Sequence, residues 1–522
     1  MILGDPAGRE ANAGGSAQIT LDDLFRHALK RRPEACALAD PPNRAAFTIG
    51  PPRRYSYAEA DRIISAIADR FCQLGLATDS VIGLQLPNTA EAALTLLGVL
   101  RAGMIAAMLP LLWRRAELVC ALERVGARAI VTCARIGAVD HCELAMHVAA
   151  DVFAIRHLCG FGARFADGVI PLDDLLDAAP TGEALPAPRA GHAADHIAVI
   201  TFESTAQGPI AVARSHKQLV AGGLATLLEA GIEQDAALLG TCSLGAFGGL
   251  AHTFVPWLIA GGTLSLHHGF DRKAFAAQCG VEGCDTVVVP GVLVAPLHQA
   301  ALLSHRGLRT VLAAWRAPEQ AGRDRGAFAA SHQLVDAMIF GEIGVIAARC
   351  DGESRSSLIP LGPVQAPRGE TGAMTVVETA RSEAGTLLLR GPAVPRHPFP
   401  PGIERSPWPQ LAADAAGFVD TGYRCRIEGE PPALVLTGPP AGTVSVGGYR
   451  FLLSDLQDQV ARLDPAATIG ALPDALAGHR LFGLAADARR LREILAERGV
   501  NPLLADAFRE RDAAASAPGH PC

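Results

Sequence analysis

The sequence predicts an α/β fold, with a large N-terminal domain of mixed, mostly parallel sheets and packed helices and a small C-terminal α+β domain. Three observations support this prediction. The chain has 522 residues, which is too many for one ordinary core. Hydrophobic residues make up 49% and charged residues 19%, a balance typical of globular proteins. Short β-rich runs alternate with stretches of helical periodicity, a pattern that predicts α/β units.

The first elements follow in that order along the chain. Apolar residues recur at helical spacing at Ile64, Ile67 and Phe71, within 55-YSYAEADRIISAIADRFCQLGL-76. The next segments read as strand (81–87), helix (90–103) and strand (128–133). Later strands are expected in three β-rich runs, at residues 196–202, 262–268 and 285–291.

The second half of the chain changes character. Segment 391–410 is rich in proline and is expected to be irregular, and residues 417–430 and 433–442 look like a β-hairpin. A Gly/Pro-rich hinge at 438-GPPAG-442 precedes a last part with its own strand and helix signals. The predicted division is a disordered tail (1–18), a large domain (19–437), a hinge (438–443) and a shortened C-terminal domain (444–522).

Composition excludes several classes of function. The net charge is −7 with no dense basic cluster, so we expect no nucleic-acid partner. The apolar run 92–113 is interrupted by Arg101 and Pro110, which favours a buried helix plus a strand over a membrane span. The N-terminus lacks the pattern of a signal peptide, and the twelve cysteines are scattered, so we expect reduced thiols and a cytoplasmic location.

One loop has the outline of a phosphate-binding turn: 199-VITFESTAQGPIAVARSH-216. A strand-like run leads into small and hydroxyl residues, then Gly208, and then a Ser-His pair that could open a helix. The same loop carries a carboxylate at Glu203 and has no lysine before Ser215. It therefore raises the question of whether it can hold a nucleotide.

The order of these pieces resembles the adenylate-forming superfamily of AMP-dependent synthetases and ligases, which includes acyl-CoA synthetases, luciferases and peptide-synthetase adenylation domains. The likeness covers about residues 19 to 500. Besides the loop above it rests on segments that include 84-LQLPNTAEAALTLLGVLRAG-103, 314-AWRAPE-319, 340-FGEIG-344, 419-VDTGY-423 and 445-SVGGYRFLLSDLQ-457. The resemblance implies a ligase that couples a carboxylic acid to ATP with Mg²⁺ and passes the acyl group to a thiol, often coenzyme A.

The phosphate loop of that family reads roughly T-S-G-T-T-G-x-P-K-G-V. This chain keeps hydroxyls at Ser204 and Thr205 and a glycine at Gly208, which the resemblance makes candidates for cofactor binding. The lysine position is Ile210, and Glu203 adds a negative charge near the place where phosphates would lie. The loop thus resembles an ATP-binding loop that lacks its lysine.

The remaining motifs also lack residues that the family uses to bind ATP and Mg²⁺. In the glutamate motif that contributes to the magnesium site, Phe340 and Gly341 stand at the first two positions, and Glu342 lies two residues early. Glu342 is therefore only a weak candidate for a metal ligand or a catalytic group. Tyr423 replaces the aspartate that binds the ribose hydroxyls, and it has one hydroxyl and no charge.

Three further positions bear on activity. Ala317 lies in the segment that is near the adenine pocket in the family. The family's adenylation lysine is near the C-terminus, but the only lysines here are Lys30, Lys217 and Lys273. His216 is a weak catalytic candidate, because a lone histidine at a helix start is more often structural.

Three functions stay open from the sequence. The first is a ligase homologue with weak or no adenylation that binds an acyl acid, acyl-CoA or a nucleotide, or that regulates a partner. The second is an active acid–thiol ligase with rearranged catalytic groups, and the third is an interaction subunit of an active ligase. The implied cofactors are ATP or AMP with Mg²⁺, and coenzyme A, and the replaced motif positions put their binding in doubt.

Overall fold

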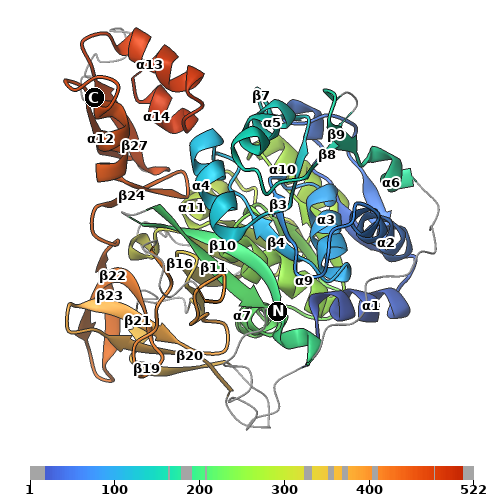
Figure 1. Cartoon of the computed structure of the whole chain (residues 1–522). Coiled ribbons are helices and arrows are strands. Elements are labelled where there is room, and N and C mark those ends of the chain that lie inside the picture. The colour runs from blue at the N-terminus through green and yellow to red at the C-terminus, as the bar shows by residue number, and fades with distance from the viewer. Residues whose placement is uncertain are drawn as a thin grey trace.

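The computed structural model describes residues 18–162, 165–177, 191–205, 208–321, 332–350, 358–366, 374–402, 409–474 and 476–508 (Figure 1). Nearly all of the predicted tail, residues 1–17, lies outside the described residues, as do Ala206 and Gln207 of the loop and the last residues of the chain. The predictions on those residues stay untested.

A seven-stranded sheet is built from the N-terminal part of the chain, and all of its neighbouring strands are parallel except for one edge pair. The order is β11 (Gly208–Ser215), β10 (Ile197–Thr205), β4 (Ile105–Met108), β3 (Val81–Leu84), β5 (Ala129–Cys133), β8 (His157–Phe161) and β9 (Val169–Pro171). The helices of this part are α2 (Tyr57–Gln73), α3 (Ala90–Arg101), α4 (Arg115–Val125), α5 (His141–Asp151) and α6 (Asp173–Asp177). The apolar run at 92–113 forms α3, whose residues are all buried, and then β4.

A second sheet has eight strands and is parallel except at its two edges. The order is β17 (Gly344–Arg349), β16 (Gln333–Phe340), β15 (Thr310–Trp315), β14 (Thr286–Pro290), β12 (Ala237–Gly240), β13 (Thr263–Leu266), β1 (Cys36–Ala39) and β2 (Arg54–Ser56). The longer helices around it are α1 (Leu21–Arg31), α7 (His216–Ala230), α9 (Val255–Ala260), α10 (Arg272–Glu282) and α11 (Val294–Gln299). The alternation of strand and helix periods in the sequence predicted this arrangement.

A six-stranded antiparallel sheet follows, shown in orange in Figure 1. Its order is β18 (Leu358–Pro360), β23 (Ala433–Gly438), β22 (Val419–Glu428), β21 (Thr386–Arg390), β20 (Met374–Arg381) and β19 (Gly362–Ala366). Strands β22 and β23 pair antiparallel, which confirms the hairpin predicted for this part of the sequence.

The C-terminal domain, red in Figure 1, has a small antiparallel sheet and a core of its own. Its strands run in the order β25 (Tyr449–Leu452), β24 (Thr443–Val446), β27 (Gly478–Leu484) and β26 (Thr468–Asp474). Helices α12 (Leu453–Ala461), α13 (Ala488–Glu497) and α14 (Pro502–Asp506) cover it, with Val460, Leu495 and Phe508 buried at its centre. The predicted fold class is confirmed, and the predicted boundaries at 438–443 stay a prediction. Of the helices described, none combines the length and the apolar character needed to cross a bilayer.

Candidate functional site

A cavity of about 520 Å³ lies where the two large sheets meet the C-terminal domain. Trp113, Phe202 and Ser204 line it from the side of the seven-stranded sheet. The second sheet contributes Trp315 and the segment after it, and β24 and β25 contribute Ser445 and Arg450. A volume of this size suits a drug-sized ligand, so we describe this cavity as the candidate site and call it the main cavity.

The loop with the outline of a phosphate-binding turn is a β-hairpin in the structure. Strand β10 pairs with β11 through Glu203 opposite Ile210, Ser204 opposite Pro209 and Thr205 opposite Gly208. The Thr205 hydroxyl donates to the Gly208 carbonyl oxygen at 2.7 Å. Pairing of this kind uses backbone groups in the strand ladder, whereas a phosphate-binding nest needs them turned toward the ligand.

The Glu203 carboxylate is held from two directions. One oxygen accepts a hydrogen bond from Arg450 Nη2 at 2.6 Å, and the other accepts the backbone N–H of Glu342 at 2.5 Å. The Arg450 and Glu203 side chains are only 12% and 11% exposed. Burial lowers the pKa of Arg450, but the carboxylates of Glu203 and Glu342 outweigh burial and raise it. The guanidinium therefore stays charged, and it ties the C-terminal domain to the hairpin.

Gly341 makes room for this ion pair. Its backbone has a φ of +60°, in the left-handed region that favours glycine. A Cβ atom built on Gly341 would overlap both Arg450 Nη2 and Glu203 Oε2. The shape of this turn therefore depends on a residue without a side chain at this position.

Glu342 reaches the cavity but is already engaged. Its Oε2 accepts the backbone N–H of Phe247 at 2.7 Å, and its Oε1 lies 3.5 Å from Arg316 Nη2. Burial raises the pKa of Glu342, the Arg316 charge lowers it, and the nearby Glu203 adds to the rise. Among the described residues there is no group of three or more His, Cys, Asp or Glu side chains that could hold a metal ion. The role of Glu342 as a metal ligand stays a prediction.

Tyr423 lies behind the cavity and not in its lining. Its side chain is 1% exposed, its hydroxyl donates to the Arg316 carbonyl oxygen at 3.4 Å, and its ring meets Phe340 edge-on at 5.5 Å. Burial raises its pKa to about 12, so the phenol is neutral at physiological pH. The guanidinium of Arg450 lies 5.6 Å from the ring centroid. Tyr423 and Phe340 thus support the segment that carries Arg316.

Arg214 and His216, at the junction of β11 and α7, contact other parts of the scaffold. Arg214 is buried, lies 3.5 Å above the Phe247 ring, and donates to the carbonyl oxygens of Glu342 and Ile343 at 2.5 and 2.9 Å. It holds the turn at 342–343 and makes no hydrogen bond to Glu203. His216 Nδ1 accepts the backbone N–H of Leu21 at 3.3 Å and is 6% exposed. These contacts anchor α7 and α1 to the scaffold.

Two titratable groups in the cavity lining, His268 and Cys242, are uncharged. Burial lowers the pKa of His268 to about 4 and raises that of the Cys242 thiol to about 11, so both are neutral near pH 7. Asn88 fixes this part of the lining, because its amide donates to the carbonyl oxygens of Cys242 and His267 at 2.8 and 3.3 Å. Its own oxygen accepts the backbone N–H of Leu244 at 3.1 Å. A ligand end without charge would fit here.

The structure brings only part of the predicted site together. Ser204, Ala317 and Glu342 line the main cavity, whereas Thr205, Gly208, Phe340, Gly341 and Tyr423 are not in its lining and His216 faces α1. Their roles in binding stay predictions. The sequence analysis missed Arg316 and Arg450, although both stand in segments that carry the resemblance. A search for cations able to replace the missing lysine could have found them.

Comparisons with known proteins agree with this architecture. The profile of the family described as "AMP-binding enzyme" matches residues 25–396. The chain is 27% identical over 507 residues to a salicyl-AMP ligase / salicyl-S-ArCP synthetase from Mycobacterium tuberculosis, covering 91% of this chain and 84% of that protein. It is 32% identical over 112 residues to human long-chain fatty acid transport protein 1, covering 22% of this chain and 16% of that protein.

Solved structures show the same fold. The apo structure of MbtA from Mycobacterium smegmatis matches with a TM-score of 0.65 and 23% identity, over 95% of this chain and 92% of that one. The amide bond synthetase McbA from Marinactinospora thermotolerans matches with a TM-score of 0.68 and 16% identity, over 93% and 94% of the two chains. With a family profile that spans most of its length, the chain belongs to the AMP-binding enzyme family.

Proposed function

We propose that this protein binds a small carboxylic acid or its acyl-adenylate in the main cavity, excludes ATP, and adenylates weakly or not at all. The observation that carries the proposal is the Glu203 carboxylate, which is held by Arg450 and by the Glu342 N–H beside the cavity. In the resembling phosphate loops this stretch faces the phosphates of ATP. Here a built-in carboxylate takes the hydrogen-bond donors that an anionic ligand would need.

The repulsion between Glu203 and a bound phosphate would be large enough to weaken binding. A phosphate oxygen about 4 Å from Glu203 would be repelled by about 1 kcal/mol in water and about 4 kcal/mol at the effective dielectric of a protein surface. Arg450 balances the Glu203 charge, so the pair as a whole offers a phosphate no net positive charge. None of the three lysines of the chain lies in the C-terminal domain.

The donor set also argues against a triphosphate with Mg²⁺. One oxygen of Glu342 accepts the Phe247 N–H and the other faces Arg316. Tyr423 stands at the position of the family's ribose-binding aspartate. It is buried and neutral, so it offers no carboxylate to a ribose. The lining of the main cavity therefore does not fit Mg·ATP.

The acid itself is proposed to be small and aromatic. The part of the lining with the uncharged His268 and Cys242 suits an apolar or aryl group. The relative whose similarity spans most of the chain is named for salicylate, which supports an aryl acid as the first compound to try.

One observation favours a second candidate, an active ligase with rearranged groups. Arg316 and Arg450 both line the main cavity, so two guanidinium groups converge on one ligand space. Arginine forks bind anions well, although they do not reproduce the point charge of a lysine. In that case Arg316 would have to serve the phosphates while Arg450 stays paired with Glu203.

The test is calorimetry on the whole protein with two titrants. The first is Mg·ATP, and the second is a stable sulfamoyl analogue of salicyl-adenylate. We expect no ATP binding up to millimolar concentration and saturable binding of the analogue, with no salicylate-dependent pyrophosphate exchange. Micromolar ATP binding together with exchange would overturn the proposal in favour of the active ligase.

A variant tests whether the Glu203 carboxylate is what excludes ATP. Glu203→Gln keeps the size of the side chain and removes its charge, so it frees the Arg450 cation for a ligand. We expect ATP binding to become measurable in Glu203→Gln, and Glu123→Gln on α4, away from the main cavity, serves as the matched control. If Glu203→Gln binds ATP no better than the wild-type protein, the carboxylate is not what excludes the nucleotide.

A further inference from the structure

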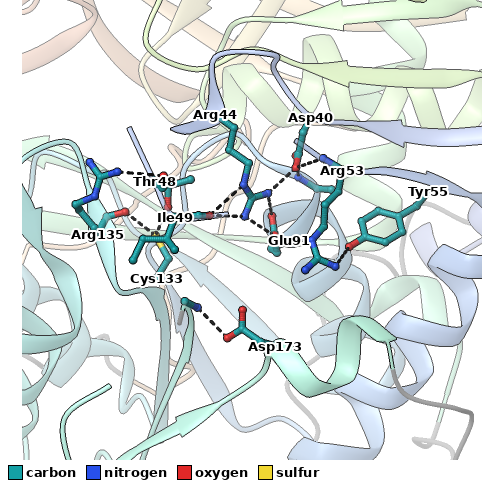
Figure 2. Close-up of polar contacts among 12 residues, drawn as sticks. Asp40, Arg44, Thr48, Ile49, Arg53, Tyr55, Glu91, Cys133, Arg135 and Asp173 are labelled. Carbon is teal, nitrogen blue, oxygen red and sulfur yellow. Dashed lines mark hydrogen bonds and ion pairs between the residues drawn. The ribbon is translucent and has the colours of Figure 1, made fainter. Parts of the chain in front are cut away.

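A second cavity, also of about 520 Å³, lies in the seven-stranded sheet and apart from the main cavity. It opens at the carboxyl ends of three neighbouring parallel strands. Leu86 and Thr89 follow β3, Cys133 ends β5, and Phe161 ends β8. Figure 2 shows the polar contacts around it.

Topology explains why a crevice forms at this place. The chain leaves β3 through α3 to reach β4 on one side, and then returns through α4 to β5 on the other side of β3. The connections after β3 and β5 therefore diverge. Open α/β sheets bind ligands at such a switch point, in the crevice outside the carboxyl ends of the strands.

A buried charge network forms one wall. Arg44 makes a two-pronged contact with Glu91, from Nη2 to Oε1 at 2.7 Å and from Nη1 to Oε2 at 2.9 Å. Arg44 Nη1 also donates to Asp40 Oδ2 at 2.5 Å, and Asp40 accepts the backbone N–H groups of Ala90 and Arg53 (Figure 2). Two carboxylates thus share one guanidinium, and the network carries a net negative charge. Burial and the Glu91 charge accordingly raise the pKa of Asp40 to about 6.

Asp173 supplies a carboxylate that is only partly used. One oxygen accepts the backbone N–H of Gly162 at 2.8 Å, and the other is turned toward the Arg44–Glu91 pair (Figure 2). Burial raises the pKa of Asp173, and the Glu91 charge adds to the rise. Arg53, on the same rim, donates to the Tyr55 hydroxyl at 3.2 Å and lies 3.7 Å from Asp177. Arg135 is bound to the carbonyl oxygens of Ala45, Thr48 and Gly137 and is not in the lining.

The rest of the lining is apolar. Ile49, Leu86, Phe161 and Phe165 face the cavity, with two aromatic rings among them. Burial raises the pKa of the Cys133 thiol to about 12, so this sulfur is an inert part of the wall. An occupant would meet an apolar pocket. At one end it would meet three carboxylates (Asp40, Glu91 and Asp173) against two guanidinium groups (Arg44 and Arg53), an excess of one negative charge.

We propose that this second cavity binds a small primary amine with an apolar or aromatic body, its ammonium group facing Asp173 and the Arg44–Glu91 pair. The ammonium group would donate a hydrogen bond to the Asp173 oxygen that does not accept the Gly162 N–H. Its positive charge would balance the excess negative charge of the carboxylates. Its body would lie against Leu86 and the phenylalanine rings. A carboxylic acid of the same shape would be disfavoured, because it would add a negative charge where one is already in excess.

The two cavities share a wall. Residues 86–89 form it, with Leu86, Pro87 and Thr89 facing the second cavity and Asn88 facing the main one. Phe47 adds a ring contact to His268 at 4.5 Å, next to Thr48 of the second cavity. A test must therefore show which of the two cavities holds the amine.

The experiment is a calorimetric titration of the whole protein with phenethylamine at neutral pH. Hydrocinnamate and phenethyl alcohol have nearly the same shape and carry a negative charge and no charge, respectively. We expect phenethylamine to bind saturably and at least about tenfold more tightly than either of them. Asp173→Asn should weaken amine binding by about tenfold or more, while Asp174→Asn, the neighbouring residue paired with Arg70, should leave it unchanged.

Two further variants show which of the two cavities holds the amine. Ile49→Trp should fill the second cavity and abolish binding, and Phe270→Ala, which enlarges the main cavity, should leave it intact. The proposal is overturned if phenethylamine shows no saturable binding up to about 10 mM. It is equally overturned if hydrocinnamate binds as well as the amine, if Asp173→Asn has no effect, or if Phe270→Ala abolishes binding while Ile49→Trp does not.

Discussion

At the scale of single residues, Glu203 shows how one buried carboxylate links two segments that lie far apart in the sequence. Its charge requires a partner when it is buried, and Arg450 supplies it from a position 247 residues further along the chain. Removing either side chain alone would leave the other charge buried and unpaired. The pair is therefore a constraint on both segments at once.

The glycine at 341 gives a direct test of this contact. Gly341→Ala should destabilise the protein by about 1–3 kcal/mol, because the new Cβ enters the space of the Glu203–Arg450 pair at a left-handed position. Gly447→Ala is the matched control, since Gly447 has a similar φ of +57° but nothing within 4 Å of an added Cβ. Chemical denaturation of both variants measures the difference. Equal losses in the two variants would attribute the effect to backbone strain alone.

At the residue scale, the sequence alone shows only which side chains are present or absent. The absence of lysine at Ile210, and of any lysine in the C-terminal domain, can be read directly from the chain. The partner of Glu203 could not be read in the same way, because ion pairing between distant segments depends on the fold. The nearest arginine in the sequence, Arg214, does not pair with Glu203 but binds the carbonyl oxygens of Glu342 and Ile343.

At the scale of elements, the hairpin β10–β11 and helix α7 form one continuous unit. The Ser-His pair predicted to open a helix does so, with Ser215 as the N-cap and His216 as the first residue of α7. Ser215 and Gln218 form a capping box, in which the Ser215 N–H donates to Gln218 Oε1 at 2.9 Å and Ser215 Oγ accepts the Gln218 N–H at 3.3 Å. The cap fixes where the hairpin ends.

Ser215→Ala should therefore weaken the start of α7. The loss of the cap leaves a buried N–H without its acceptor and should lower the free energy of unfolding by about 1 kcal/mol. Thermal and urea unfolding measure it, with Ser215→Asn as a control that keeps an acceptor at the cap. No change in Ser215→Ala would contradict the capping role.

Elements were predictable because periodicity and capping are local properties. The run 92–113 was correctly divided into a helix and a strand, since Arg101 ends α3 and residues 105–108 form β4. The second cavity was not foreseen, because it arises from strand order. Neither the position of β5 beside β3 nor the meeting of Arg44 with Glu91 is visible in the sequence pattern.

At the scale of the whole molecule, buried neutral histidines link stability to pH. Burial lowers the pKa of His141 and His252 to about 3 and that of His268 to about 4. As the pH falls through 6.5, the unfolded chain binds protons at these positions and the folded chain does not. The free energy of unfolding therefore decreases below about pH 6.5, by about 1.4 kcal/mol per pH unit for each histidine.

His252→Gln isolates one part of this effect. The variant should lose stability less steeply than the wild-type protein between about pH 7 and 5, by about 1 kcal/mol per pH unit. The slope is measured by urea unfolding at several pH values, and His27→Gln, on the exposed face of α1, is the control. Parallel slopes in His252→Gln and the wild-type protein would show that His252 is protonated in the folded state as well.

The contact between Arg450 and Glu203 also joins the C-terminal domain to the hairpin. Swinging the domain away would break this ion pair and its hydrogen bond, so the pair favours the arrangement in which the two domains touch. A closed resting state would give the same X-ray scattering profile in solution with and without a bound adenylate analogue. The chain would then differ from a hinged enzyme in its mechanics: an internal ion pair, and not the arrival of a ligand, would hold its two domains together.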